Sequence, residues 1–124
     1  MVGIGRTPAA EGPARGDVHF VAFAEVGGHI MRGPHPAVVV QSDRLRRSAT
    51  TMVVPMTSTS RAAEFSPPYL VAVTARESGL DRDGWVKCDQ IRTFPIEALG
   101  PRVGRLNAEA LQRVEAALRF TLDL

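Results

Sequence analysis

Short runs of hydrophobic residues recur along most of the chain, and segments rich in Gly, Pro and Ser separate them. Alternating or continuous apolar runs predict five or six short strands, over 17–25, 37–41, 51–56, 69–74, 85–88 and 91–94, the last two being separate or one bent strand. Pro36 cannot donate to a β ladder, so we expect it to open the second strand. Short strands with turn residues between them predict a strongly bent antiparallel barrel.

The C-terminal segment has a different period. Asn107 is a favourable N-cap, and Glu109 lies in the first turn, where the helix dipole favours an anion. Apolar residues then repeat every three or four positions, at Ala110, Leu111, Val114, Ala117, Leu118 and Leu122. The chain is therefore predicted to be mainly β with one amphipathic α-helix packed on the sheet at its C-terminus.

Length and composition limit the number of domains to one. The 124 residues are 44% hydrophobic and 23% charged, which is typical of a folded globule and too short for a second core. Residues 1–14 are rich in Gly, Pro and Ala without any period, so we expect a flexible N-terminal tail followed by one domain over 15–124. The net charge of +2 is too small to establish nucleic-acid binding.

Several classes of site are not expected. Cys88 is the single cysteine, which excludes an internal disulfide and a Cys-rich zinc site. His19, His29 and His35 lack the spacing and the neighbours of a zinc site, so we expect no metal and no cofactor. No stretch approaches the roughly 20 apolar residues that span a bilayer, and no signal peptide is recognisable. The cytoplasm is the expected compartment.

Polar and ionisable residues cluster where predicted strands end, over 28–36, 54–58 and 87–93. Strand ends on a rigid scaffold are where proteins commonly present site residues. Two structural alternatives remain open: Asp89 and Arg92 could form a strand-end ion pair, and Thr57 with Ser58 could cap a turn.

These segments resemble the MazF/PemK (Kid) family of toxins. The similarity comprises Gly28-His29, then Gly33 to Val40 with His35-Pro36-Ala37, then Val53-Val54-Pro55-Met56-Thr57-Ser58, and finally Cys88-Asp89-Gln90-Ile91-Arg92-Thr93. Each motif is weak alone, but four in the same order and spacing are specific, and the resemblance covers roughly 15–124. It implies an SH3-like, CcdB-type barrel that forms a homodimer and is neutralised by a MazE-like antitoxin.

The resemblance also implies an activity. Family members cleave single-stranded RNA at short sequences without metal: the ribose 2′-hydroxyl attacks its own phosphate and leaves a 2′,3′-cyclic phosphate and a 5′-hydroxyl. This reaction needs a base, an acid and positive charge at the phosphorus. The family has Arg before the proline of the second strand, where this chain has His35, and Arg32 is a candidate to replace that charge.

The Kid branch uses a different set, which corresponds to His29, Lys87 and Asp89 here, with Lys87 in place of Arg. By this resemblance Asp89 is the predicted general base and Lys87 the charge stabiliser or acid. His29 and His35 would shape the phosphate site. The predicted phosphate and RNA contacts are Thr57, Arg32, Gln41, Ser58, Gln90 and Arg92.

Two other functions remain open. A CcdB-like toxin that poisons DNA gyrase shares the barrel, although residues 117–124 lack the Trp on which such toxins depend. A catalytically lapsed homologue would only bind antitoxin or RNA, as the replacement of Arg by His35 allows.

Overall fold

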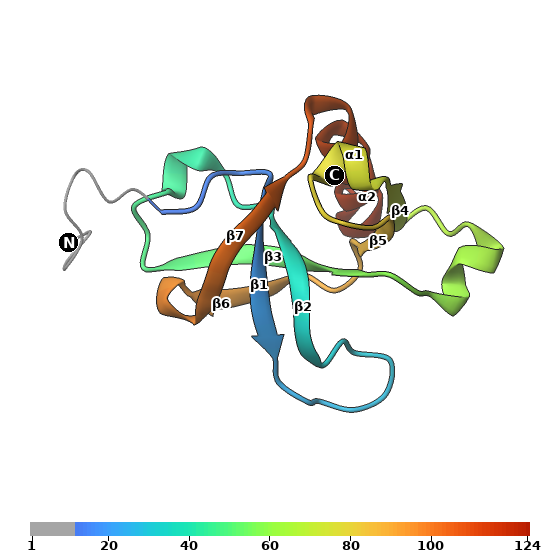
Figure 1. Cartoon of the computed structure of the whole chain (residues 1–124), viewed down its shortest axis with the longest axis horizontal. Coiled ribbons are helices and arrows are strands. Elements are labelled where there is room, and N and C mark those ends of the chain that lie inside the picture. The colour runs from blue at the N-terminus through green and yellow to red at the C-terminus, as the bar shows by residue number, and fades with distance from the viewer. Residues whose placement is uncertain (1–11) are drawn as a thin grey trace.

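The computed structural model describes residues 12–124, which form one bent antiparallel sheet with a helix packed against one end (Figure 1). The strands are β1 (Asp17–Phe23), β2 (Gly33–Val39), β3 (Thr50–Thr57), β4 (Leu70–Val73), β5 (Gly84–Lys87), β6 (Arg92–Pro95) and β7 (Leu99–Arg105). The helices are α1 (Ala75–Ser78) and α2 (Ala108–Leu122), with short 3₁₀ turns η1 (Asp43–Leu45), η2 (Arg61–Phe65) and η3 (Ile96–Ala98).

The sheet has the order β4-β5-β3-β2-β1-β7. One side of β3 pairs with β2, and its other side pairs first with β6 and then with β5. The strands β5 and β6 are therefore separate, joined by a turn after Lys87. The predicted fold class, mainly β with a C-terminal helix, is confirmed, although no pairing between the described strands β4 and β7 closes the sheet into a barrel.

Buried valines fill the core on both faces of the bend. The larger cluster lies between the sheet and α2, and it includes Val18, Val38, Val54, Val86 and Val114. A second cluster, formed by Val21, Phe23, Ala37, Val39 and Val53, packs against the inner side of β6 and β7 through Phe94 and Leu99. The predicted apolar stripe of α2 is buried at Ala110, Val114 and Ala117, whereas Leu122 is exposed.

The second strand begins earlier than its sequence predicts. Pro36 lies inside β2, which starts at Gly33 and also contains Pro34. Both prolines pair with β1, opposite Phe20 and Ala22, whereas β3 joins β2 only from Ala37 onward. On the side of β3, residues 33–36 therefore form an edge of the sheet. The N–H groups that Pro34 and Pro36 lack leave no carbonyl of a neighbouring strand without a partner there.

Two elements were not predicted. Helix α1 is short, and its capping box joins Thr74 to Glu77. Strand β7 contains Gly100 and Gly104, which weaken a strand pattern. The structure explains why Gly104 is needed, because a Cβ there would lie 2.3 Å from the carbonyl oxygen of Ser78.

The N-terminal tail predicted over 1–14 lies mostly outside the described residues. Within the described part, the backbone N–H of Gly12 donates to the carbonyl of Arg46, and that of Ala14 donates to Asp17. These bonds attach residues 12–14 to the domain. No helix of the described chain combines the length and the apolar composition needed to cross a membrane.

Candidate active site

Two neighbouring hollows contain most of the predicted site residues. The larger, which we call the Asp89 groove, has a volume of about 840 Å³ and is lined by His29, Lys87 and Asp89 among others. The smaller, the His35 hollow, measures about 460 Å³ and is lined by His35, Thr57 and Ser58 among others. Thr59 lines both. The structure therefore brings the predicted catalytic residues together as two adjacent groups.

In the Asp89 groove, Lys87 ends strand β5 and Asp89 lies in the turn that follows it, and both residues line the groove. Cys88, between them, is fully buried in the core. The turn is closed by the N–H of Gln90, which donates to the carbonyl of Lys87 (3.1 Å). Neither charged side chain forms an ion pair within residues 12–124, and the alternative pair between Asp89 and Arg92 is not formed. Both charges are available to a substrate.

The neighbouring Cys88 thiol is not a candidate nucleophile. Burial raises its pKa to about 12, with a smaller contribution from the nearby Asp89 carboxylate. The group is thus a neutral thiol at physiological pH and serves as core packing.

His29 reaches the Asp89 groove from the β1–β2 loop, which Gln90 fastens in place. The side-chain oxygen of Gln90 accepts from the N–H of Met31 (2.7 Å), and its amide donates to the carbonyl of His29 (2.9 Å). Only 9% of Gln90 is exposed. Gln90 was predicted to contact RNA, but its amide is committed to the loop, so we assign it to positioning His29.

In the His35 hollow, strand β2 supplies the imidazole and the end of β3 supplies the hydroxyls. Nε2 of His35 lies 2.9 Å from the carbonyl oxygen of Arg32 and must donate to it. A neutral His35 therefore carries its lone pair on Nδ1. The hydroxyl of Thr57 donates to the carbonyl of Thr59 (2.8 Å) and also accepts from its N–H, so the turn-cap alternative holds for Thr57.

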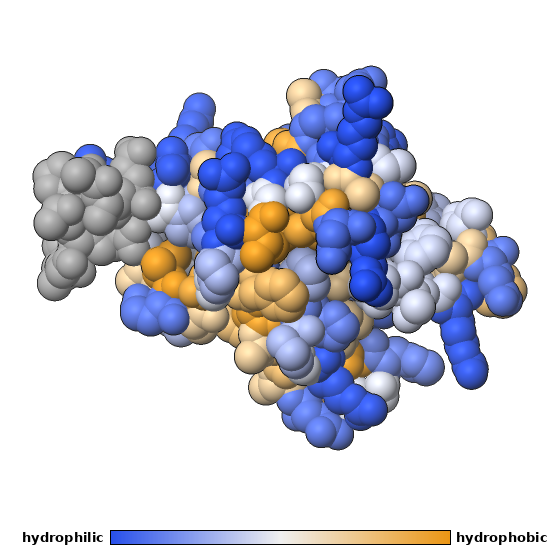
Figure 2. All heavy atoms as spheres, viewed as in Figure 1, coloured by the Kyte–Doolittle hydropathy of each residue, from blue (hydrophilic) through white to orange (hydrophobic). Residues whose placement is uncertain are grey.

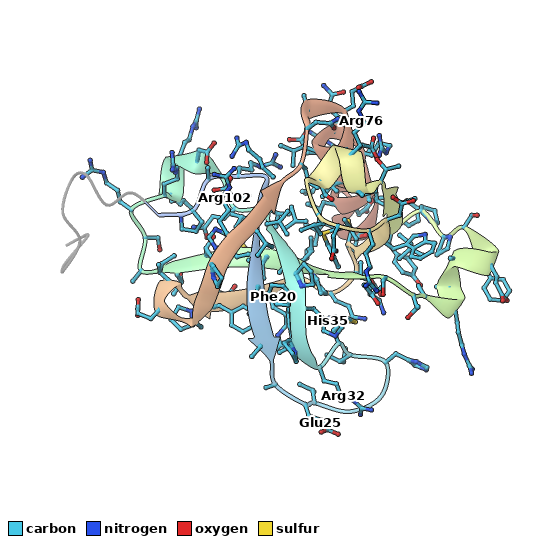
Figure 3. The ribbon with its side chains drawn as sticks, viewed as in Figure 1. Phe20, Glu25, Arg32, His35, Arg76 and Arg102 are labelled. Atoms are coloured by element: carbon cyan, nitrogen blue, oxygen red, sulfur yellow. The ribbon has the colours of Figure 1, made fainter. Side chains whose placement is uncertain are left out.

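Three further predicted RNA contacts lie elsewhere. Arg32 pairs with Glu25 (3.2 Å) at the tip of the β1–β2 loop and lines neither hollow, so the structure does not bring its charge into the His35 hollow (Figure 3). Gln41 is 7% exposed and donates to the backbone carbonyls of Leu45 and Thr50, so its amide is used within the fold and lines neither hollow.

Arg92 is also used within the fold. Its guanidinium carbon lies 5.8 Å from the ring centroid of Phe23 and 5.6 Å from that of Phe94. The Phe23 ring lies 6.4 Å from the ring of His35. Arg92 thus packs over two phenylalanine rings, one of which neighbours His35, and it lines neither hollow.

Sequence reasoning missed residues on two loops. Arg61, Phe65 and Tyr69 line the Asp89 groove, and the 81–83 turn lines the His35 hollow. The signal for the first set was present, since one basic residue and two aromatic residues lie within nine positions, on either side of Pro67-Pro68. No three His, Cys, Asp or Glu side chains of the described chain are grouped to hold a metal ion.

Residues 14–122 match the family described as PemK-like, MazF-like toxin of type II toxin–antitoxin systems. The chain belongs to this family. The match spans the sheet, both hollows and all of α2, and it confirms the family that the sequence resembles.

Individual relatives agree with this assignment. Endoribonuclease MazF9 of Mycobacterium tuberculosis is 33% identical over 116 residues, covering 89% of this chain and 96% of the relative. Endoribonuclease EndoA of Bacillus subtilis is 32% identical over 111 residues, covering 89% and 94%. A mycobacterial endoribonuclease solved in complex with its cognate antitoxin superposes with a TM-score of 0.74 at 25% identity, covering 90% of this chain and 96% of that one. The names of these toxins agree with the predicted enzyme class.

Proposed function

We propose that this chain is a metal-independent endoribonuclease toxin that cleaves single-stranded RNA at a specific sequence. The observation that carries the proposal is the convergence of His29, Lys87 and Asp89 on one groove, from a loop and a turn 58 to 60 positions apart in the chain. The three side chains offer an imidazole, a cation and a carboxylate, which together meet the needs of phosphodiester transfer. The endoribonuclease relatives supply independent support.

In the proposed reaction the charged side chains of Asp89 and Lys87 have separate roles. The Asp89 carboxylate accepts the proton of the ribose 2′-hydroxyl, whose oxygen then forms a bond to the adjacent phosphorus. The bond from phosphorus to the 5′ oxygen breaks, and that oxygen takes a proton from Lys87, while Lys87 and His29 stabilise the charge on the phosphorane. The products are a 2′,3′-cyclic phosphate and a 5′-hydroxyl.

The His35 hollow extends the substrate path. It adjoins the Asp89 groove at Thr59 and presents the His35 imidazole and the exposed Ser58 hydroxyl. In this proposal the two groups bind the phosphate next to the one that is cleaved. A His binds phosphate through one donor at a time, so we expect a weaker contact than an Arg would give.

The proposal includes two protein partners and the cytoplasm as the place of action. An apolar band crosses the face shown in Figure 2, over β1 and its neighbours, where Phe20 is partly exposed (Figure 3). We infer that a second copy of the chain covers this band and forms a homodimer. A MazE-like antitoxin would neutralise the enzyme, as the antitoxin complex of the mycobacterial relative suggests.

The test is incubation of the purified chain with RNAs of varied sequence in EDTA, followed by analysis of the new ends. We expect cleavage at a short motif in unpaired regions, with 5′-hydroxyl ends that a kinase can label directly. Intact RNA across all sequences, or fragments with 5′-phosphate ends, would overturn the proposal. Inhibition of DNA gyrase by the same preparation would instead support the CcdB-like alternative.

A variant at His35 distinguishes an active enzyme from a catalytically lapsed homologue. We expect the natural chain to be active and His35→Arg to lower KM through a bidentate phosphate contact. If cleavage appears only in His35→Arg, the natural chain is a lapsed homologue.

A further inference from the structure

Phe65 is the most exposed aromatic side chain of the described residues, at 79%, yet it lines the Asp89 groove. Most large apolar side chains of a domain this size are withdrawn from water, because exposing one forfeits its transfer free energy. The η2 segment that carries Phe65 protrudes from the body of the molecule (Figure 1). Neither the core nor α2 explains this position.

The backbone holds Phe65 on a defined turn. The N–H of Ser66 donates to the carbonyl of Ala63, and the N–H of Ala63 donates to that of Ser60. Ser66 has a φ of 44°, a left-handed conformation that reverses the chain directly after the aromatic residue. Pro67 and Pro68 then restrict the following backbone. An aromatic ring held on such a turn loses little further entropy on binding.

A second aromatic residue lies nearer the charged groups. The carbonyl of Tyr69 accepts a hydrogen bond from the N–H of Cys88 (3.0 Å), which places Tyr69 beside the residue between Lys87 and Asp89. Tyr69 is half-buried and lines the same groove as Phe65. Arg61 adds a cation to the groove wall. Aromatic and basic side chains, together with the acidic Glu64, thus line the groove that contains the candidate reaction centre.

We propose that Phe65 and Tyr69 form a stacking platform for the unpaired bases beside the cleaved phosphate. Every nucleobase has a π face, so aromatic rings beside cations are the usual way to hold a single strand. A base inside a duplex already stacks on its neighbours and cannot lie on the platform, so the platform would select unpaired RNA. The inference rests on the proposed function, and it assigns the preference for single strands to these two residues.

The test uses an uncleavable probe, an RNA 2′-O-methylated at every ribose that carries 2-aminopurine beside the cleavage site. Stacking on an aromatic ring quenches this base, so we expect quenching by the natural chain and by Phe65→Trp. With Phe65→Leu, which keeps an apolar side chain, quenching should fall and the Kd should rise roughly 5- to 150-fold, as expected for one lost stacked base. Phe120→Leu is the matched control, since Phe120 is 61% exposed on α2 and lines neither hollow.

Unchanged quenching and Kd in Phe65→Leu would overturn the inference, as would equal losses in Phe65→Leu and Phe120→Leu. Circular dichroism of each variant checks that the fold is retained. Tyr69→Phe keeps the ring and should bind the probe like the natural chain, whereas Tyr69→Leu should weaken binding. Because the probe cannot be cleaved, the two proposals fail separately. Absence of quenching by the natural chain refutes the platform, whereas absence of RNA cleavage refutes only the proposed function.

Discussion

Gln90 is predicted to determine activity by holding the loop that carries His29. Its two hydrogen bonds, to Met31 and to His29, join segments about 60 residues apart in the chain. Replacement by Met keeps the length of the side chain and removes both bonds. At about 1 kcal/mol for each bond, the free energy of unfolding should fall by about 2 kcal/mol.

The chain offers a matched control in Gln41. This residue is buried to a similar degree and also forms two hydrogen bonds to the backbone, in this case donating both, to the carbonyls of Leu45 and Thr50. Those bonds lie at the end of β3 remote from Thr57 and from both hollows. Gln41→Met should therefore lose a similar amount of stability in urea titrations without any effect on the β1–β2 loop.

Two measurements separate the variants. Hydrogen exchange of the backbone amides in residues 24–32 should accelerate in Gln90→Met and stay unchanged in Gln41→Met. The kcat for RNA cleavage should fall on the order of 10- to 100-fold in Gln90→Met, because a catalytic group displaced by about 1 Å can cost that much. Equal exchange rates and equal kcat in the two variants would refute the positioning role of Gln90.

Three further predictions concern stability. Gly104→Ala should destabilise the fold by about 1–3 kcal/mol or more in urea, because its Cβ would lie 2.3 Å from the Ser78 carbonyl, and wild-type stability would contradict the packing. Asn107→Ala removes the side-chain cap on the N–H of Ala110 (2.9 Å), so about 1 kcal/mol should be lost, whereas Asn107→Asp should keep most of it. Because burial raises the pKa of Cys88 to about 12 from an ordinary 9.0, only the unfolded chain loses this proton as the pH rises above 9. The free energy of unfolding should then fall between pH 9 and 12, and a Cys88→Ala variant that keeps the same slope would show that another group causes it.

The elements that could be predicted from the sequence are those in which the residues of the element itself carry a clear hydrophobic period. The rough alternation in 17–23 predicts a strand, and the helical period after Asn107 predicts α2 and its buried face. The alternation of Val18, Phe20 and Ala22 does not give the buried face of β1, because Phe20 and Ala22 are exposed and Val21 and Phe23 are buried. Strand β7 was not predicted because Gly100 and Gly104 weaken its strand pattern. These glycines allow close contacts with β1 and with Ser78, which are distant in the sequence and leave no local pattern. The extension of β2 through Pro34 and Pro36 depends likewise on where β3 begins to pair.

The candidate site, like the fold, could be predicted only in part from the sequence. Resemblance to a family selected His29, Lys87 and Asp89, and the structure brings them to one groove. Local sequence does not record which side chains bond to distant backbone, so it predicts Gln41 and Gln90 as RNA contacts, whereas in the structure their amides bond to the backbone. The same holds for Arg92, whose position over two phenylalanine rings depends on the pairing of β6 with β3.

We infer that the Asp89 groove, and not the His35 hollow, contains the reaction centre. The most direct test is single-turnover cleavage of one RNA by Asp89→Asn and by His35→Asn, each compared with the natural chain in EDTA. Loss of the general base should slow the chemical step of Asp89→Asn by about 10²- to 10⁴-fold. His35→Asn should mainly weaken RNA binding, with a far smaller effect on that step. A large loss of the chemical step in His35→Asn, with Asp89→Asn still active, would contradict the claim.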